Sequence, residues 1–165
     1  MVEVNEEIVK HYFELQGYFV LTNVSFWKVP GKRGIKGRGD IDLVMFHPIK
    51  KQAVIAEVKG WHEEKMTGAY FKDKETYNRL FSFVSNEAIR EAHVKLGTRR
   101  IKKVLIVPDY NEDFKQKALT KVDEILNFRD VLGGIIKEVK KKPKEPYKSE
   151  VLQMIRLLSK YGFLK

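Results

Sequence analysis

The stretch GDIDLVMFHPIKKQAVIAEVK, residues 39–59, decides the fold. It contains two apolar runs, residues 40–46 and 53–59, whose length and β-branched content are typical of buried strands. A turn region, residues 47–51, separates them. Two strands joined so closely are expected to form an antiparallel hairpin.

The charged residues inside these runs have a predicted partner across the hairpin. A hairpin symmetric about the bond between residues 49 and 50 places Asp42 opposite Glu57 and Asp40 opposite Lys59. Residues directly opposite share one face, with Cβ atoms roughly 5 Å apart. Four ionisable groups would then lie together on an apolar sheet, provided that no bulge or slip changes the register.

This combination of charges suits phosphodiester hydrolysis. Two close carboxylates resist joint ionisation unless a cation lies between them. Mg²⁺ prefers carboxylate oxygens, and a water acidified by Mg²⁺ or Mn²⁺ can attack a phosphodiester. We therefore expect Asp42, Glu57 and the Val58 carbonyl to bind the metal. Lys59 would orient the attacking water or neutralise developing charge.

The same two runs resemble the D…ExK core of PD-(D/E)xK nucleases, a superfamily that includes many restriction endonucleases. The resemblance covers residues 5–107 in the order of elements. It implies a mixed sheet flanked by helices and Mg²⁺-dependent cleavage of DNA, or sometimes RNA. Asp42 matches the family's aspartate better than Asp40 does. Many members also supply a glutamate from the first helix, which Glu6 matches, with Glu7 as the alternative.

Three other interpretations of these residues stay open. The acids and the lysine could form an ordinary cross-strand salt bridge on an edge hairpin. The chain could be a nucleic-acid-binding module on the same fold without catalysis. It could also be a structural or assembly protein that docks through its C-terminal helix.

The charge balance favours a polyanionic partner. The chain of 165 residues has 32 Lys and Arg against 22 Asp and Glu, a formal net charge of +10. Nucleic acid is the commonest partner of such a basic field, and we expect DNA more than RNA. A glycine-rich loop, residues 28–39, is predicted to contact the phosphate backbone through Lys32, Arg33, Lys36 and Arg38. A solvated, flexible loop is the alternative.

Several classes of protein are excluded. The chain has no cysteine, which rules out disulfides and thiolate zinc sites. It has no P-loop, which argues against nucleotide hydrolysis. No segment has the roughly 20 apolar residues of a membrane span, and the N-terminus lacks a signal-peptide pattern. We expect a soluble, cytoplasmic protein with no membrane partner.

The remaining periodicity predicts an α/β fold with a mixed central sheet flanked by helices, of the restriction-endonuclease-like type, plus a C-terminal helix. The further elements expected are a helix capped by Asn5 and ended by Gly17, strands 18–26 and 101–107, helices 72–96 and 111–128, and a last strand 131–139. The predicted domain division is a nuclease-like domain, residues 1–139, a basic linker, 140–146, and a C-terminal helical element, 147–165. This last element must pack either on the main domain or on a second subunit, which would make a homodimer.

Overall fold

The computed structural model describes residues 4–29, 37–60, 65–98, 100–142 and 146–164. Its centre is a five-stranded sheet in the order β1-β2-β3-β4-β5. The strands are β1 (Phe19–Trp27), β2 (Arg38–His47), β3 (Gln52–Val58), β4 (Ile101–Val107) and β5 (Glu124–Asn127). The first three pair antiparallel, whereas β3, β4 and β5 pair parallel. The predicted mixed α/β sheet is therefore confirmed.

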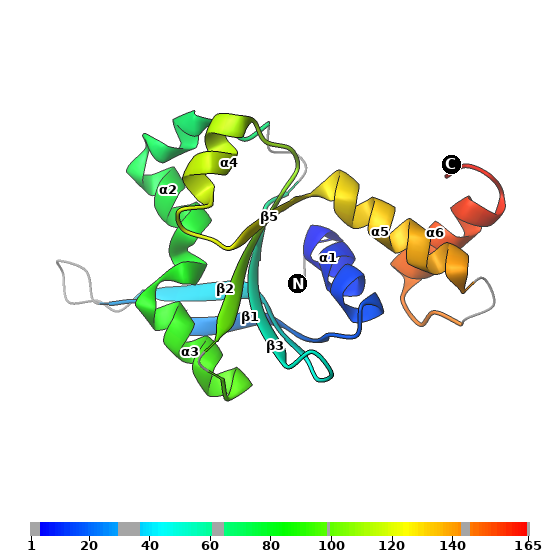
Figure 1. Cartoon of the computed structure of the whole chain (residues 1–165), viewed down its shortest axis with the longest axis horizontal. Coiled ribbons are helices and arrows are strands. Elements are labelled where there is room, and N and C mark those ends of the chain that lie inside the picture. The colour runs from blue at the N-terminus through cyan, green and yellow to red at the C-terminus, as the bar shows by residue number, and fades with distance from the viewer. Residues whose placement is uncertain (1–3, 30–36, 61–64, 99, 143–145, 165) are drawn as a thin grey trace.

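Helices cover both faces of this sheet (Figure 1). One core lies under α1 (Val4–Leu15) and α5 (Phe128–Lys141). The other lies under α2 (Lys74–Phe81), α3 (Asn86–Leu96) and α4 (Glu112–Ala118). The C-terminal helix α6 (Glu150–Lys160) packs on α5. Because β3 is buried on both faces, its sequence is a continuous apolar run, and any charge within it is costly.

The predicted register of the hairpin is confirmed. Leu43 lies opposite Ala56 and His47 lies opposite Gln52, so the pairing is symmetric about the bond between residues 49 and 50. Regular pairing of β2 with β3 is recorded only between these limits. Asp42 and Glu57 lie directly beyond the last recorded pair, Leu43 and Ala56, at the open end of the hairpin.

Two predicted helices are wrong in extent. Residues 72–96 form α2 and α3 rather than one helix, separated by the short 3₁₀ turn η2 (Ser82–Val84). Ser85 is extended, and its hydroxyl accepts a hydrogen bond from the backbone N–H of Ala88, so it starts a new helix. The predicted helix 111–128 ends as α4, and its last residues form β5, which pairs with β4.

The predicted last strand, 131–139, is also wrong, because these residues belong to α5. The Asn127 side chain caps this helix by accepting from the backbone N–H of Asp130 at 2.8 Å. The apolar residues that face the core recur at helical spacing: Val131, Ile135 and Val139. The helix continues through Lys141, so the linker predicted for residues 140–146 begins later than expected.

The first helix differs from the prediction at its start but not at its end. Helix α1 begins at Val4, so Asn5 is a buried residue within it rather than its cap. Gly17 follows the helix with φ of 92°, a conformation that favours glycine and ends the helix as predicted. Within the described ranges, no helix is long and apolar enough to cross a membrane.

Candidate active site

Strands β2 and β3 bring Asp42, Glu57 and Lys59 together. The Lys59 Nζ donates to Glu57 Oε1 at 2.6 Å. The backbone N–H of Val58 donates to Asp42 Oδ2 at 2.7 Å. Lys59 is itself held by β4, because its backbone N–H donates to the carbonyl of Ile106 at 2.9 Å. The predicted group is therefore fixed by backbone contacts from two neighbouring strands.

An irregularity in the strands places the Asp42 side chain. β1 and β2 pair on both sides of Asn23 and Asp42, so these two residues lie opposite each other. Asn23 has φ of 52°, which interrupts a regular strand. Leu43 packs in the core under α1 and α5, whereas Ile41 packs in the core under α2–α4. Residues two apart in a regular strand share a face, so the backbone turns at Asp42. Sequence reasoning missed Asn23, although asparagine is depleted in strands.

Glu57 is the most unusual residue of the site. It is 5% exposed. Its pKa is raised from 4.5 to about 8, chiefly by burial and also by the neighbouring Asp42 and Glu6 carboxylates, against the opposing effect of Lys59. Its Oε2 is buried and has no hydrogen-bond partner among the described residues. A buried oxygen without a hydrogen bond lowers the stability of the fold. Such a destabilising group is typical of a functional carboxylate.

A divalent cation fits this environment. The buried Oε2 of Glu57 lacks a ligand, and a second carboxylate, Asp42, lies close enough to raise the pKa of Glu57. A hard cation between the two would satisfy the oxygen and remove the repulsion. Among the residues that the structure describes, no group of three or more His, Asp and Glu side chains is arranged to hold a metal. Binding through these residues would thus use two carboxylates, with backbone or water ligands in addition.

The first helix turns one of its two glutamates toward this site. Glu6 accepts a hydrogen bond from Asn23 Nδ2 at 3.3 Å and acts on the pKa of Glu57. Glu7 instead lies 3.5 Å from His11 Nε2. Of the two alternatives left open by the sequence, the structure brings Glu6 to the site.

The structure also bears on the predicted Asp40–Lys59 pair and on the predicted phosphate contacts of the glycine-rich loop. The regular pairing of β2 with β3 ends at Leu43 opposite Ala56, so the predicted placement of Asp40 opposite Lys59 lies beyond it. The strand turns at Asp42, and Asp40 instead accepts from Ser25 Oγ at 2.7 Å. Arg38 lies at the start of β2, 5.8 Å above the ring of Trp27. The other predicted phosphate contacts, Lys32, Arg33 and Lys36, lie outside the described residues.

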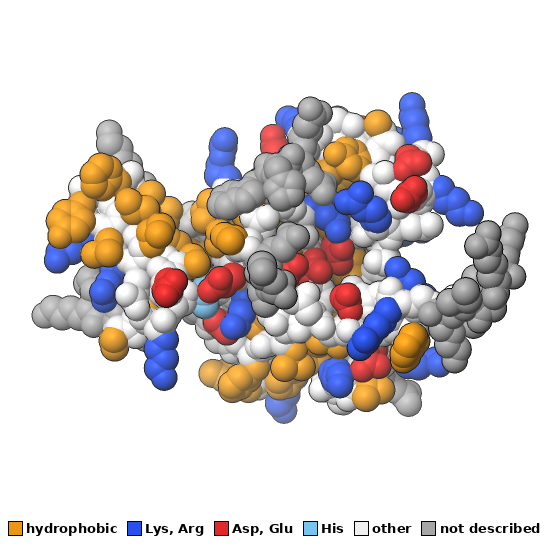
Figure 2. Space-filling view, turned by 180° about the vertical axis from the view of Figure 1, so that it is seen from behind, with side chains coloured by type: hydrophobic (Ala, Val, Ile, Leu, Met, Phe, Trp, Pro, Cys, Tyr) orange, Lys and Arg blue, Asp and Glu red, His pale blue; other side chains and the backbone are white. Residues whose placement is uncertain are grey.

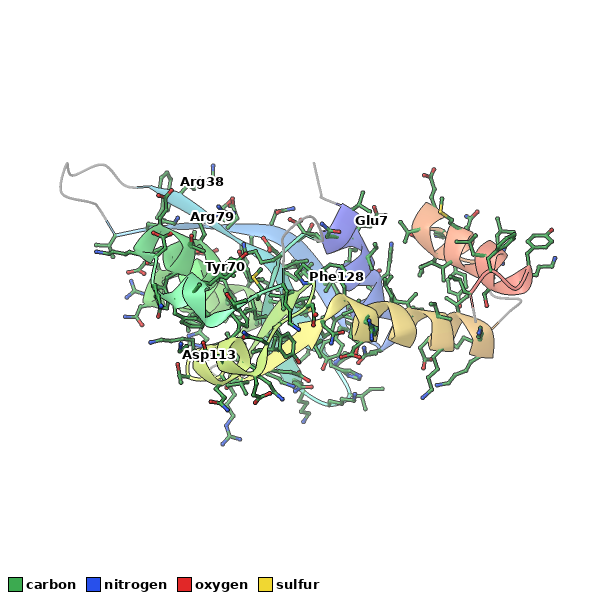
Figure 3. The ribbon with its side chains drawn as sticks, turned by 90° about the horizontal axis from the view of Figure 1, so that it is seen from above. Glu7, Arg38, Tyr70, Arg79, Asp113 and Phe128 are labelled. Carbon is green, nitrogen blue, oxygen red and sulfur yellow. The ribbon has the colours of Figure 1, made fainter. Side chains whose placement is uncertain are left out.

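A basic hollow adjoins the site. It has a volume of about 620 Å³ and lies between Lys28, Lys59 and α2. Figure 2 shows acidic side chains gathered at the centre of one face, with Lys and Arg side chains beside them. Tyr70 and Arg79, labelled in Figure 3, come from the segment that forms this side of the site.

Comparison with known proteins gives structural neighbours at low similarity. No protein-family model and no curated sequence matches the chain. A complex of EndoMS with dsDNA has 16% identity and a TM-score of 0.41, over 74% of this chain and 41% of that one. A repair endonuclease from Pyrococcus abyssi has 15% identity and a TM-score of 0.39, over 73% and 43%. The chain spans less than half the length of either protein, and similarity at this level does not establish a shared activity.

Proposed function

We propose that this protein is a metal-dependent nuclease that hydrolyses phosphodiester bonds in nucleic acid, DNA more than RNA. The observation that carries the proposal is Glu57, a carboxylate buried beside Asp42 and Lys59 with one oxygen unsatisfied among the described residues. A buried group of this kind is costly for stability and is expected where it serves chemistry.

Each residue of the site has a proposed role. Asp42 and Glu57 would hold Mg²⁺ or Mn²⁺, together with the Val58 carbonyl. The bound metal would polarise the scissile phosphate and lower the pKa of a water. Lys59 would orient that water or neutralise charge on the phosphate, since its ammonium already lies at the carboxylate pair. Glu6 would assist from α1, through the Asn23 contact that holds it near Glu57.

The charge of the chain supports nucleic acid as the substrate. The net charge is +10, and Lys28, Lys74 and Arg79 line the hollow beside Lys59. These cations would attract a phosphate backbone and hold it near the carboxylates. The preference for DNA comes from the resemblance of the D…ExK residues.

Cleavage assays on defined substrates test the proposal. Labelled single-stranded, duplex and branched DNA, and RNA, are incubated with Mg²⁺, Mn²⁺ or EDTA. We expect metal-dependent cleavage that falls by at least about a hundredfold in Glu57→Gln and in Lys59→Ala. Glu124→Gln is the matched control, because Glu124 also pairs with a lysine, Lys102, at 2.7 Å but is far more exposed. Full activity in Glu57→Gln would contradict the assignment.

A second candidate is a non-catalytic nucleic-acid-binding module. The ion pair of Lys59 with Glu57 favours it, because that lysine already occupies one oxygen of the carboxylate. Such a module would bind nucleic acid in a salt-dependent manner and need no metal. Calorimetry with Mg²⁺ separates the two, since a binding module has no reason to take up the ion at Glu57.

Helix α6 supports a homodimer as the assembly. Leu152 is buried against the main domain, but Met154, Leu157, Tyr161 and Phe163 are exposed. Figure 2 shows hydrophobic side chains gathered at the end of the molecule that carries α5 and α6. Exposed apolar clusters often mark interfaces. We expect Leu157→Glu to lower the solution mass measured by light scattering, and an unchanged monomeric mass for both proteins would contradict the dimer.

A further inference from the structure

Two hollows of the surface meet at Lys59. The smaller, of about 160 Å³, is lined by Lys59, Tyr70, Thr76, Arg79 and Leu80. The larger, of about 620 Å³, shares Lys59 and Arg79 with it and continues along the exposed side of α2. A path therefore leads from the candidate active site outward along this helix.

The outer part of this path is basic. Its cations are Lys28, which follows β1, Lys59, which follows β3, and Lys74 and Arg79 on α2. Its acids are Asp73 and Glu75 at the start of α2. Asp73 is engaged as the helix cap, accepting from the backbone N–H of Thr76 at 2.7 Å. Lys59 is paired with Glu57, and the remaining three cations outnumber the two acids, which leaves a net attraction for an anion.

The polar groups of the path suit phosphate rather than a compact organic ligand. Asn78 and Ser82 also line the hollow and offer hydrogen-bond donors without charge. The cations come from three separate segments around an open hollow of the surface. Such a hollow leaves room for an extended phosphate backbone.

Arg79 has a particular position in this path. It is exposed on the last turn of α2, and it lines both hollows together with Lys59. The planar guanidinium can donate two parallel hydrogen bonds to one phosphate, which lysine cannot. A phosphate held by Arg79 would adjoin the one that Lys59 meets.

We propose that the path along α2 binds the sugar–phosphate backbone of the substrate strand beside the scissile phosphate, and that Arg79 holds the neighbouring phosphate. The inference rests on the proposed function for cleavage of the phosphate at Lys59. Binding of the backbone along α2 does not depend on it. It assigns the backbone contact nearest the site to α2, in addition to the loop predicted from the sequence.

A second basic hollow of the same volume provides a comparison. It is lined by Lys50, Lys51, Arg100, Lys102 and Lys103, with Asp123 as its acid. It lies where β3 and β4 begin, whereas Lys59 follows the end of β3. Arg100→Ala therefore removes an exposed arginine from a hollow that has more cations and fewer acids than the α2 hollow but lies away from Asp42 and Glu57. Arg90→Ala on α3 removes an exposed arginine from neither hollow.

Fluorescence anisotropy in EDTA tests the proposal without any cleavage. The probes are a labelled single-stranded oligonucleotide and its duplex, titrated at several salt concentrations. We expect Arg79→Ala to weaken binding of both probes by about tenfold and to reduce the salt slope by about 1. Arg79→Lys should keep the slope but recover only part of the affinity. Arg90→Ala should bind as the wild type does.

Two results would overturn the inference. One is an Arg79→Ala protein that is folded and binds like Arg90→Ala. The other is a larger loss in Arg100→Ala than in Arg79→Ala, which would place the backbone at the opposite hollow. In cleavage assays, Arg79→Ala should raise KM by a larger factor than it lowers kcat. Weakened binding in a protein without nuclease activity would refute the proposed function alone, and cleavage with unchanged affinity would refute the α2 path alone.

Discussion

Replacing Glu57 with glutamine should change how stability depends on pH in the metal-free protein. The pKa of Glu57 is about 8 in the folded state, against 4.5 as its ordinary value, because the carboxyl is buried beside Asp42. Between these values the folded state binds a proton that the unfolded state releases. The free energy of unfolding therefore falls as the pH rises from about 4.5 to about 8. A difference of about 3.5 pH units corresponds to about 5 kcal/mol above pH 8.

Glutamine keeps the shape of Glu57 but cannot ionise. For a domain of this size, about 1 kcal/mol shifts Tm by roughly 2–4 °C. In EDTA near pH 9 we therefore expect Glu57→Gln to unfold about 10 °C above the wild type, since loss of the Lys59 ion pair offsets part of the gain. Near pH 5 the wild-type carboxyl is protonated when folded, and the two melting temperatures should nearly coincide.

The assay is thermal unfolding followed by circular dichroism at both pH values. Glu124→Gln serves as the matched control, because its ion pair with Lys102 is exposed and its removal should change Tm little at either pH. A difference between Glu57→Gln and the wild type that is the same at both pH values would refute the reasoning.

Three further predictions follow from the same structure. Mg²⁺ near pH 8 should raise the Tm of the wild type in thermal shift measurements but not that of the glutamine variant, because only an ionised Glu57 attracts the ion. In helix α5, Gly134→Ala should destabilise the protein by about 1–3 kcal/mol in urea unfolding, since its Cβ would lie 2.5 Å from Cε2 of Tyr12. Gly133→Ala, with open space around it, should stabilise by about 0.5–1 kcal/mol. Leu152 is buried, so Leu152→Ala should lower the free energy of unfolding by about 2–5 kcal/mol. Met154 is exposed on α6, so Met154→Ala should change that free energy by less than about 0.5 kcal/mol.

The hairpin of β2 and β3 could be predicted because its signals are local. Both strands are apolar runs with a short turn between them, and the symmetric register follows from the length of that turn. The register brings Asp42 to the end of β3, where its side chain accepts a hydrogen bond from the Val58 N–H. The proximity of the charged residues is therefore a consequence of sequence spacing.

The features that sequence analysis missed depend on tertiary contacts. The pair Gly133–Gly134 lowers helix propensity, but α5 forms because its apolar face packs on α1, where Gly134 makes room for Tyr12. The short strand β5 forms because it pairs with β4, which no local pattern reveals. Likewise, the positive φ of Asn23 opposite Asp42 interrupts β1 within its pairing with β2, which no local pattern reveals.

Cleavage of labelled DNA by the wild type and by Glu57→Gln, with Mg²⁺ and with EDTA, tests the central proposal most directly. We expect cleavage by the wild type in Mg²⁺, none in EDTA, and a loss of at least about a hundredfold in the variant while its affinity for DNA is retained. Cleavage by the variant at the wild-type rate, or the absence of cleavage of any DNA or RNA by a folded wild-type protein in Mg²⁺ and in Mn²⁺, would contradict the account.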